Sequence, residues 1–104
     1  MLAYKWPHIL QLYNELIVLE YSPVTVINRA FVYAKVYGSE RALREMEKID
    51  FPQNSYYHGL MGFLYSELDV ERAIGHYRKA LALTGSVAEQ QVIAGRIRRL
   101  GECI

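Results

Sequence analysis

The sequence has almost no cysteine. Cys103, next to the last residue, is the only one. No disulfide can form within the chain, which fits a reducing compartment, so we expect a cytoplasmic protein. No apolar run reaches the roughly 18 residues of a membrane-spanning helix. The first ten residues also lack the charged and then apolar order of a signal peptide, so we expect no membrane association.

The chain also lacks a large excess of positive or negative charge. Twelve Lys and Arg residues stand against eleven Asp and Glu residues, for a formal net charge of +1. This balance predicts no general attraction to nucleic acid or to anionic membranes. The sequence also lacks a Gly-rich phosphate loop, a Gly-x-Ser-x-Gly elbow and the HExxH and CxxC patterns. We therefore expect no catalytic site, no metal and no cofactor.

What the sequence does contain is regularly spaced signals for helix ends. Pro7 suits the first turn of a helix, where its missing N–H costs no hydrogen bond. Gly38 and the pair Thr84-Gly85 are typical of helix ends. Between the signals, apolar residues recur with helical spacing, and no β-strand alternation is present. Small polar residues that cap helix N-termini stand at Ser22, Ser39, Asn54 or Ser55, Asp69 and Ser86, the last with Glu89 as a capping box.

The apolar spacing predicts which face of each helix is buried. In the last helix, Gly95 costs about 1 kcal/mol of helix propensity, which predicts that a neighbouring backbone packs close there. The predicted buried residues are Ile9, Leu12, Tyr13, Leu16 and Leu19 in the first helix, Ala42, Leu43, Met46 and Ile49 in the third, Tyr57, Leu60, Met61 and Leu64 in the fourth, Val70, Ala73, Ile74, Tyr77, Ala80 and Leu81 in the fifth, and Ile93, Ile97 and Leu100 in the sixth.

These patterns predict an all-α fold of about six helices. Short loops between them make sequential helices antiparallel, as stacked helix hairpins. A shift of 31 residues superposes Ala42 on Ala73 and Met46 on Tyr77. Each unit, a helix, a turn and a second helix, resembles a tetratricopeptide repeat (TPR), although Met61 stands at the small position and the usual period is about 34. We expect one domain, 1–104, forming a right-handed superhelix, with units 7–37 (partial), 23–53 and 54–84 and a capping helix 86–102.

A more specific resemblance covers most of residues 5–100. The segment YSPVTVINRA, residues 21–30, resembles the "SPVV-LNRA" signature of bacterial extracytoplasmic-function sigma factors that carry a long C-terminal TPR-like extension. Trp6 to Leu16 resembles the "DW--I--LYD-L" opening of that extension, with Lys5 in place of aspartate. Tyr57-His58 resembles its "YH" helix. Residues 80–89 resemble its "ALALT-NPAE" segment, with Ser86-Val87 in place of Asn-Pro.

The resemblance implies a bacterial regulatory domain that acts through protein contacts. In that family the promoter-reading and polymerase-binding regions lie N-terminal to the extension, and no helix-turn-helix with a basic recognition helix is found in this chain. We therefore expect no direct nucleic-acid binding. The implied partners are the sigma N-terminal regions, RNA polymerase or a regulator. The alternative is a free-standing TPR scaffold that binds a peptide of an unrelated partner. Apolar residues at the open ends of a short repeat stack also make a homodimer an option.

Two polar groups are candidates for an interaction surface. Asn28 and Arg29 stand in the middle of an apolar helix and could contact a partner, but an internal hydrogen-bonded role is preferred because buried polar groups are nearly always paired. His58 could line a groove beside Tyr57. A metal site is not expected there, because His8 and His76 are distant in sequence and no companion ligands accompany them.

Aromatic and basic residues supply the other candidates. Tyrosine is enriched at interfaces, so a peptide groove could be lined by Tyr33, Tyr37, Tyr57, Tyr65 and Tyr77. The alternative is core packing with the hydroxyl at the surface. Near the C-terminus of the last helix, a cluster of Arg96, Arg98 and Arg99 could bind phosphate or polymerase. The preferred interpretation is that these arginines complement the C-terminal dipole of the last helix.

Overall fold

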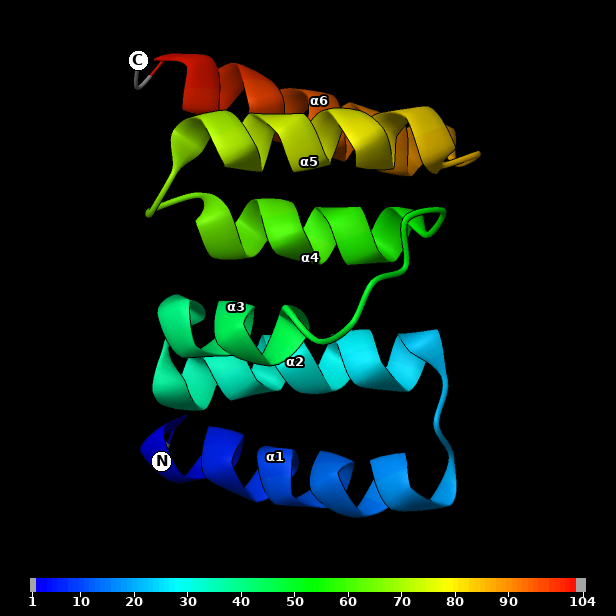
Figure 1. Ribbon diagram of the computed structural model, residues 1–104. Helices are drawn as coiled ribbons and strands as arrows, with labels where there is room; N and C mark the ends of the chain where they lie inside the picture. Colours follow the sequence, from blue (N-terminus) through cyan, green and yellow to red (C-terminus); the bar gives the residue numbers. More distant parts are fainter. Residues whose placement is uncertain (1, 103–104) are drawn as a thin grey trace. The chain divides into compact units, whose positions relative to one another are not determined.

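The computed structural model describes residues 2–102, and all regular structure in that range is helical. Cys103 lies outside the described residues. The predicted all-α class is confirmed. None of the described helices is long and apolar enough to cross a membrane. The helices are α1 (Leu2–Leu19), α2 (Pro23–Tyr37), α3 (Ser39–Met46), α4 (Ser55–Tyr65), α5 (Val70–Leu83) and α6 (Val87–Glu102), in the order shown in Figure 1.

The chain divides into two compact units. The first, Met1–Asp50, contains α1 to α3, and the second, Phe51–Ile104, contains α4 to α6. Within the first unit α2 packs against both α1 and α3. Within the second unit α5 packs against both α4 and α6. The single domain and the repeat boundaries inferred from the sequence stay predictions.

Three of the predicted helix caps are confirmed by their hydrogen bonds. The Ser22 Oγ atom accepts from the Thr25 N–H at 3.2 Å. The Asn54 Oδ1 atom accepts from the N–H groups of two residues, Tyr56 at 2.8 Å and Tyr57 at 3.1 Å. The Asp69 Oδ1 atom accepts from the N–H of the third residue of α5 at 3.2 Å. Each cap satisfies backbone donors that a helix start leaves unpaired.

Two predicted helix starts are wrong. Helix α1 begins at Leu2, so Pro7 lies inside the helix and not in its first turn. Because proline has no backbone N–H, one hydrogen bond of the helix is lost at this position. Ser39 is the first residue of α3 and caps nothing; the capping position is held by Gly38. Gly38 has φ of 93° and donates its N–H to the Ala34 carbonyl at 2.8 Å. One glycine thus ends α2 and starts α3, which leaves no separate extended residue for a side-chain cap.

The apolar face predicted for α1 is wrong in part, because only Ile9 and Tyr13 on it are half-buried. Leu12, Leu16 and Leu19 are exposed, by 53%, 39% and 85%. The face turned inward instead carries Leu10, which is buried, and Trp6, whose ring meets Phe31 of α2 edge-on at 6.1 Å. Helix α1 is apolar on most sides, so two stripes with helical spacing compete. Periodicity alone does not choose between them.

The core of the second unit is the α4–α5 hairpin. The four predicted residues of α4 are buried, and Leu64 is completely so. On α5 the buried residues are Ala73, Tyr77 and Ala80, all of them predicted. A Cβ atom placed on Gly62 would lie 2.8 Å from ring atoms of Tyr77. Gly62, rather than the neighbouring Met61, is therefore the small residue that lets α4 and α5 approach closely.

Helix α6 differs from its neighbours because none of its described residues is buried. The prediction that Ile93, Ile97 and Leu100 are buried is wrong: all three are half-buried. The predicted close packing at Gly95 is wrong as well. A Cβ atom there would meet only the Nη2 atom of Arg98, at an ordinary 3.8 Å. The helix has one neighbour, α5, as its main support and so keeps much of its surface in solvent.

The capping box at the start of α6 forms in part. The Glu89 N–H donates to the Ser86 Oγ atom at 3.3 Å, as predicted. The Glu89 carboxylate does not return to Ser86. It accepts from the Thr84 hydroxyl at 2.6 Å and from the Tyr56 hydroxyl at 3.2 Å. This carboxylate raises the pKa of the Tyr56 phenol, first through that hydrogen bond. Glu89 thus ties the start of α6 to α4.

Candidate functional site

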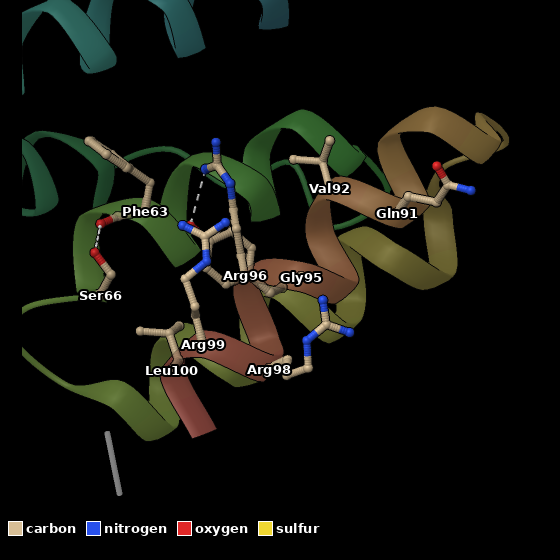
Figure 2. Close-up of a pocket in the computed structure, with 10 residues that line it drawn as sticks. Phe63, Ser66, Gln91, Val92, Gly95, Arg96, Arg98, Arg99 and Leu100 are labelled. Carbon is tan, nitrogen blue, oxygen red and sulfur yellow. Dashed lines mark hydrogen bonds between the residues drawn. The ribbon is translucent and has the colours of Figure 1, made fainter. Parts of the chain in front are cut away.

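The second unit contains an open groove beside α6. Its volume is about 580 Å³. Most of its lining comes from α6, with Phe63 of α4, Ser66 directly after α4 and Tyr77 of α5 completing it (Figure 2). Because α6 rests on α5 without burying its own residues, the side chains that face α4 remain accessible. The lining residues are Phe63, Ser66, Tyr77, Gln91, Val92, Gly95, Arg96, Arg98, Arg99 and Leu100.

Positive charge is concentrated in this groove. Three arginines line it, and of the described lining residues none is acidic. Figure 2 shows Arg96 and Arg99 extending from α6 on the same side, with Arg98 directed away from them. The Nη1 atom of Arg96 donates to the Tyr77 hydroxyl at 3.4 Å, which links α6 to α5. The arrangement suits a ligand that combines apolar groups with carboxylate or other anionic groups.

The helix dipole accounts for only part of this charge. The favourable effect of a cation falls off within the last turn of a helix. Arg99 lies in the last turn of α6, but Arg96 lies earlier. The preferred sequence interpretation therefore covers Arg99 and leaves Arg96 without a dipole explanation. The presence of both arginines at the groove therefore needs an explanation other than the helix dipole.

A second cluster lies inside the α4–α5 hairpin. The Nδ1 atoms of His58 on α4 and His76 on α5 are 3.0 Å apart. The Nε2 atom of His58 lies 2.9 Å from the Pro52 carbonyl oxygen. A carbonyl only accepts, so this nitrogen carries the proton and the Nδ1 atom of neutral His58 is an acceptor. In the neutral pair, His76 therefore donates its Nδ1–H to His58.

Aromatic rings surround the histidine pair. The Tyr57 ring meets the His58 ring edge-on at 5.0 Å, and Tyr65 stacks on His76 at 5.8 Å with an interplanar angle of 7°. Burial lowers the pKa of His76, and the positive charges of His58, Lys79 and Arg72 lower it further. Among the described residues no group of three or more His, Cys, Asp or Glu side chains is placed to hold a metal.

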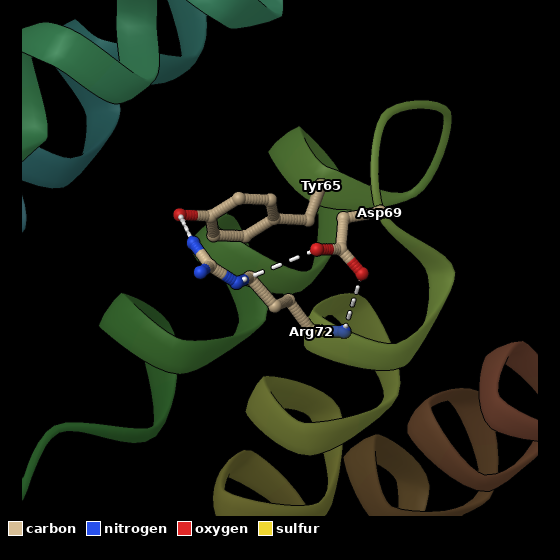
Figure 3. A network of polar contacts seen from close by, with 3 residues as sticks. All are labelled: Tyr65, Asp69 and Arg72. Carbon is tan, nitrogen blue, oxygen red and sulfur yellow. Dashed lines mark hydrogen bonds and ion pairs between the residues drawn. The ribbon is translucent and has the colours of Figure 1, made fainter.

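Tyr65 continues this cluster to the surface (Figure 3). The Arg72 guanidinium lies 5.7 Å from the centre of the Tyr65 ring, and its Nη1 atom donates to the Tyr65 hydroxyl at 3.4 Å. The Nε atom of Arg72 is 3.4 Å from the Asp69 carboxylate. Asp69 also caps α5, so the network links the helix start to the aromatic cluster. The contacts of Arg72 lie at the surface, where its side chain is 67% exposed, whereas His58 at the other end of the cluster is only 4% exposed.

In the first unit, Arg29 of α2 contacts residues of both other helices. Its Nε atom donates to the Asn14 Oδ1 atom of α1 at 2.7 Å, and its Nη1 atom lies 3.6 Å from the Glu45 carboxylate of α3. Its guanidinium is also 5.4 Å from the centre of the Tyr33 ring. Arg29 thus joins the three helices of its unit, which agrees with the preferred structural interpretation. Asn28 is exposed and lies outside these contacts.

The structure therefore separates the candidate residues into three places. Arg29 and Tyr33 lie together in the first unit, whereas Arg96 and Arg99 share the groove of the second. The third place is the α4–α5 interior, with Tyr57, His58 and Tyr65. Sequence reasoning missed His76 as the partner of His58, and it missed Phe63 and Gly95 as groove residues. A signal for the histidine pair was present, because each histidine is adjacent to an inward-facing tyrosine, Tyr57 or Tyr77.

Comparison with known proteins found no match to this chain. No family model matches the sequence, and no curated protein and no solved structure matches it either. The function is therefore inferred from the residues and their geometry.

Proposed function

We propose that the chain is a non-catalytic protein-interaction domain that binds a partner through the groove between α4 and α6. The groove itself is the observation that carries the proposal. It combines apolar side chains with arginine, which is the composition of protein interfaces at their centres. It also lies on the one helix of the second unit that buries none of its described residues.

The TPR-like arrangement is part of this proposal. Its support comes from the α4–α5 hairpin, where small residues stand at the helix crossing. Ala73 and Ala80 are completely buried, and Gly62 meets the ring of Tyr77. In TPR-like hairpins such small residues allow close approach while large ones fill the space between helices. Helix α6 then serves as the capping helix, with its outer face left for a partner.

We further propose that this domain is the regulatory extension of a bacterial extracytoplasmic-function sigma factor, working in the cytoplasm. Support comes from the part of the sequence that resembles the family signature, since its residues shape the first unit. Ser22 caps α2, Arg29 joins three helices, and Ala30 is 3% exposed. A signature made of such residues marks a shared scaffold. The partners would be the sigma N-terminal regions, RNA polymerase or a regulator.

Binding to purified transcription components tests this function. The immobilised chain is presented by biolayer interferometry with the promoter-reading and polymerase-binding regions of a sigma factor of that family, and separately with core RNA polymerase. We expect saturable binding to at least one of them. Binding to neither would overturn the sigma-factor proposal and favour the free-standing scaffold. Light scattering on the same sample reports whether the chain forms a homodimer.

A further inference from the structure

We propose that the groove beside α6 binds an acidic amphipathic helix of a partner protein, which crosses α6 at Gly95. The inference rests on the proposed interaction function and names the chemistry of the partner. Three features of the groove lead to it: its local charge, the open space at Gly95 and its exposed apolar side chains.

The charge of the groove is local and not a property of the whole chain. The chain carries a net charge of only +1, yet Arg96, Arg98 and Arg99 line the same groove, and the other described lining residues carry no charge. A partner with carboxylates along its edges complements this charge. Nucleic acid fits less well, because its binding relies on many phosphate contacts over an extended basic surface.

Gly95 indicates how close the partner comes. A glycine inside a helix costs about 1 kcal/mol relative to alanine. At Gly62 that cost has an internal reason, since a Cβ atom would collide with Tyr77. At Gly95 no such reason exists: a Cβ atom would meet only the end of the Arg98 side chain at 3.8 Å. The helical glycines Gly59, Gly75 and Gly101 also have open space, with nothing within 4 Å, but among the described lining residues of the groove Gly95 is the only glycine. Gly95 lines the groove, so its bare backbone is open to a partner helix, and helices approach most closely across such small residues.

The apolar part of the groove selects a helix with one apolar face. Val92 is 57% exposed, and it lines the groove together with Phe63 and half-buried Leu100. Val92, Gly95 and Arg99 follow each other at intervals of three and four residues along α6 and so share one face. A partner with apolar residues at the same intervals, flanked by Asp or Glu, matches this face. A peptide that binds by adding a strand would need a sheet edge, and the described residues contain no sheet.

The inference is tested with designed peptides in fluorescence anisotropy. The probe is a labelled peptide of about 16 residues, with leucines at helical spacing and glutamates on the flanking positions. One comparator replaces every glutamate by lysine, and another scrambles the order so that the charge stays but the apolar face is lost. A single-stranded DNA of random sequence is the third. We expect the glutamate probe to bind at least about tenfold more tightly than each comparator.

Variants of the full chain then locate the binding. Arg96→Ala and Arg99→Ala should each weaken binding of the glutamate probe by about threefold to tenfold. Gly95→Leu should abolish it, because the side chain fills the place of the partner backbone. Arg78→Ala, on an exposed position of α5 outside the groove, is the matched control and should leave affinity unchanged. Circular dichroism checks that each variant is folded.

The outcomes separate this inference from the function on which it rests. Equal affinity for the glutamate and lysine peptides, or unchanged affinity in Gly95→Leu, would overturn the acidic-helix inference. Tighter binding of DNA than of the glutamate probe would overturn it in favour of nucleic acid. If the chain still binds the sigma regions or polymerase while the glutamate probe fails, the interaction function stands and only the groove inference is lost. If both bindings fail, both are lost.

Discussion

Helices α5 and α6 belong to the same unit and have similar lengths, but they use their sequences differently. Helix α5 lies against both α4 and α6 and completely buries Ala73 and Ala80. Helix α6 buries none of its described residues and carries three arginines beside a groove. The contrast shows that packing against two helices determines the small buried residues of α5, whereas α6, with one main neighbour, leaves much of its surface exposed.

The largest expected difference between the interior and α6 is the cost of truncating a leucine. Leu64 of α4 is completely buried, so Leu64→Ala should lower the free energy of unfolding by about 3 kcal/mol through lost burial and a cavity. Leu100 of α6 is half-buried, so Leu100→Ala should cost less than about 1 kcal/mol. Urea denaturation followed by circular dichroism measures both. Equal costs would mean that α6 packs like an inner helix.

Alanine substitutions at two of the helical glycines, Gly62 and Gly95, should change stability in opposite directions. Gly62→Ala places a methyl group 2.8 Å from the ring of buried Tyr77. Overpacking of this kind costs about 1–3 kcal/mol, which outweighs the gain in helix propensity, so the variant should be less stable by about 1 kcal/mol. Gly95→Ala meets no such obstacle and should be more stable by up to about 1 kcal/mol. Thermal unfolding compares them, and a destabilised Gly95→Ala would show that α6 is more tightly packed than described.

Local features were the predictable part of this fold. The caps at Ser22, Asn54 and Asp69 follow from hydrogen bonds that span two or three residues, so the sequence alone specifies them. The buried residues of α5 were predictable because charged residues such as Arg72, Arg78 and Lys79 separate its apolar positions. The buried face of α1 was not, since this helix offers more than one apolar stripe. Ser39 failed as a cap because the conformation of Gly38 decided the turn.

The candidate site was harder to predict because it joins residues from separate helices. Arg96 and Arg99 stand out in the sequence, but their groove also needs Phe63, which precedes them by two helices. The pairing of His58 with His76 likewise depends on how α4 and α5 face each other. Sequence spacing describes neighbours along one helix. The distance between facing helices is set by residues such as Gly62, whose role appears only once Tyr77 is placed.

The starts of α4 and α6 should differ in the strength of their caps. Asn54 accepts two backbone hydrogen bonds, at 2.8 and 3.1 Å, so Asn54→Ala should cost about 1 kcal/mol. Ser86 accepts a single one at 3.3 Å, and Ser86→Ala should cost about half as much. Ser39→Ala is the control, because Ser39 makes no capping bond. Urea midpoints rank the three variants. A larger loss for Ser86 than for Asn54 would reverse the expected order of the two helix starts.

The smallest expected effect is a pH dependence that arises inside the α4–α5 hairpin and not on α6. The pKa of His76 is lowered in the folded protein, so between that pKa and the usual value near 6.5 the unfolded chain binds more protons. The stabilising contribution is complete above about pH 6.5 and is lost as the pH falls through the folded pKa. A proton on each histidine would also place two Nδ1–H donors face to face. Urea midpoints measured from pH 7.5 to 5 should fall less steeply in His76→Gln than in the parent chain. His8→Gln, at an exposed position on α1, is the matched control, and an equal slope in all three proteins would remove the histidine pair as the cause.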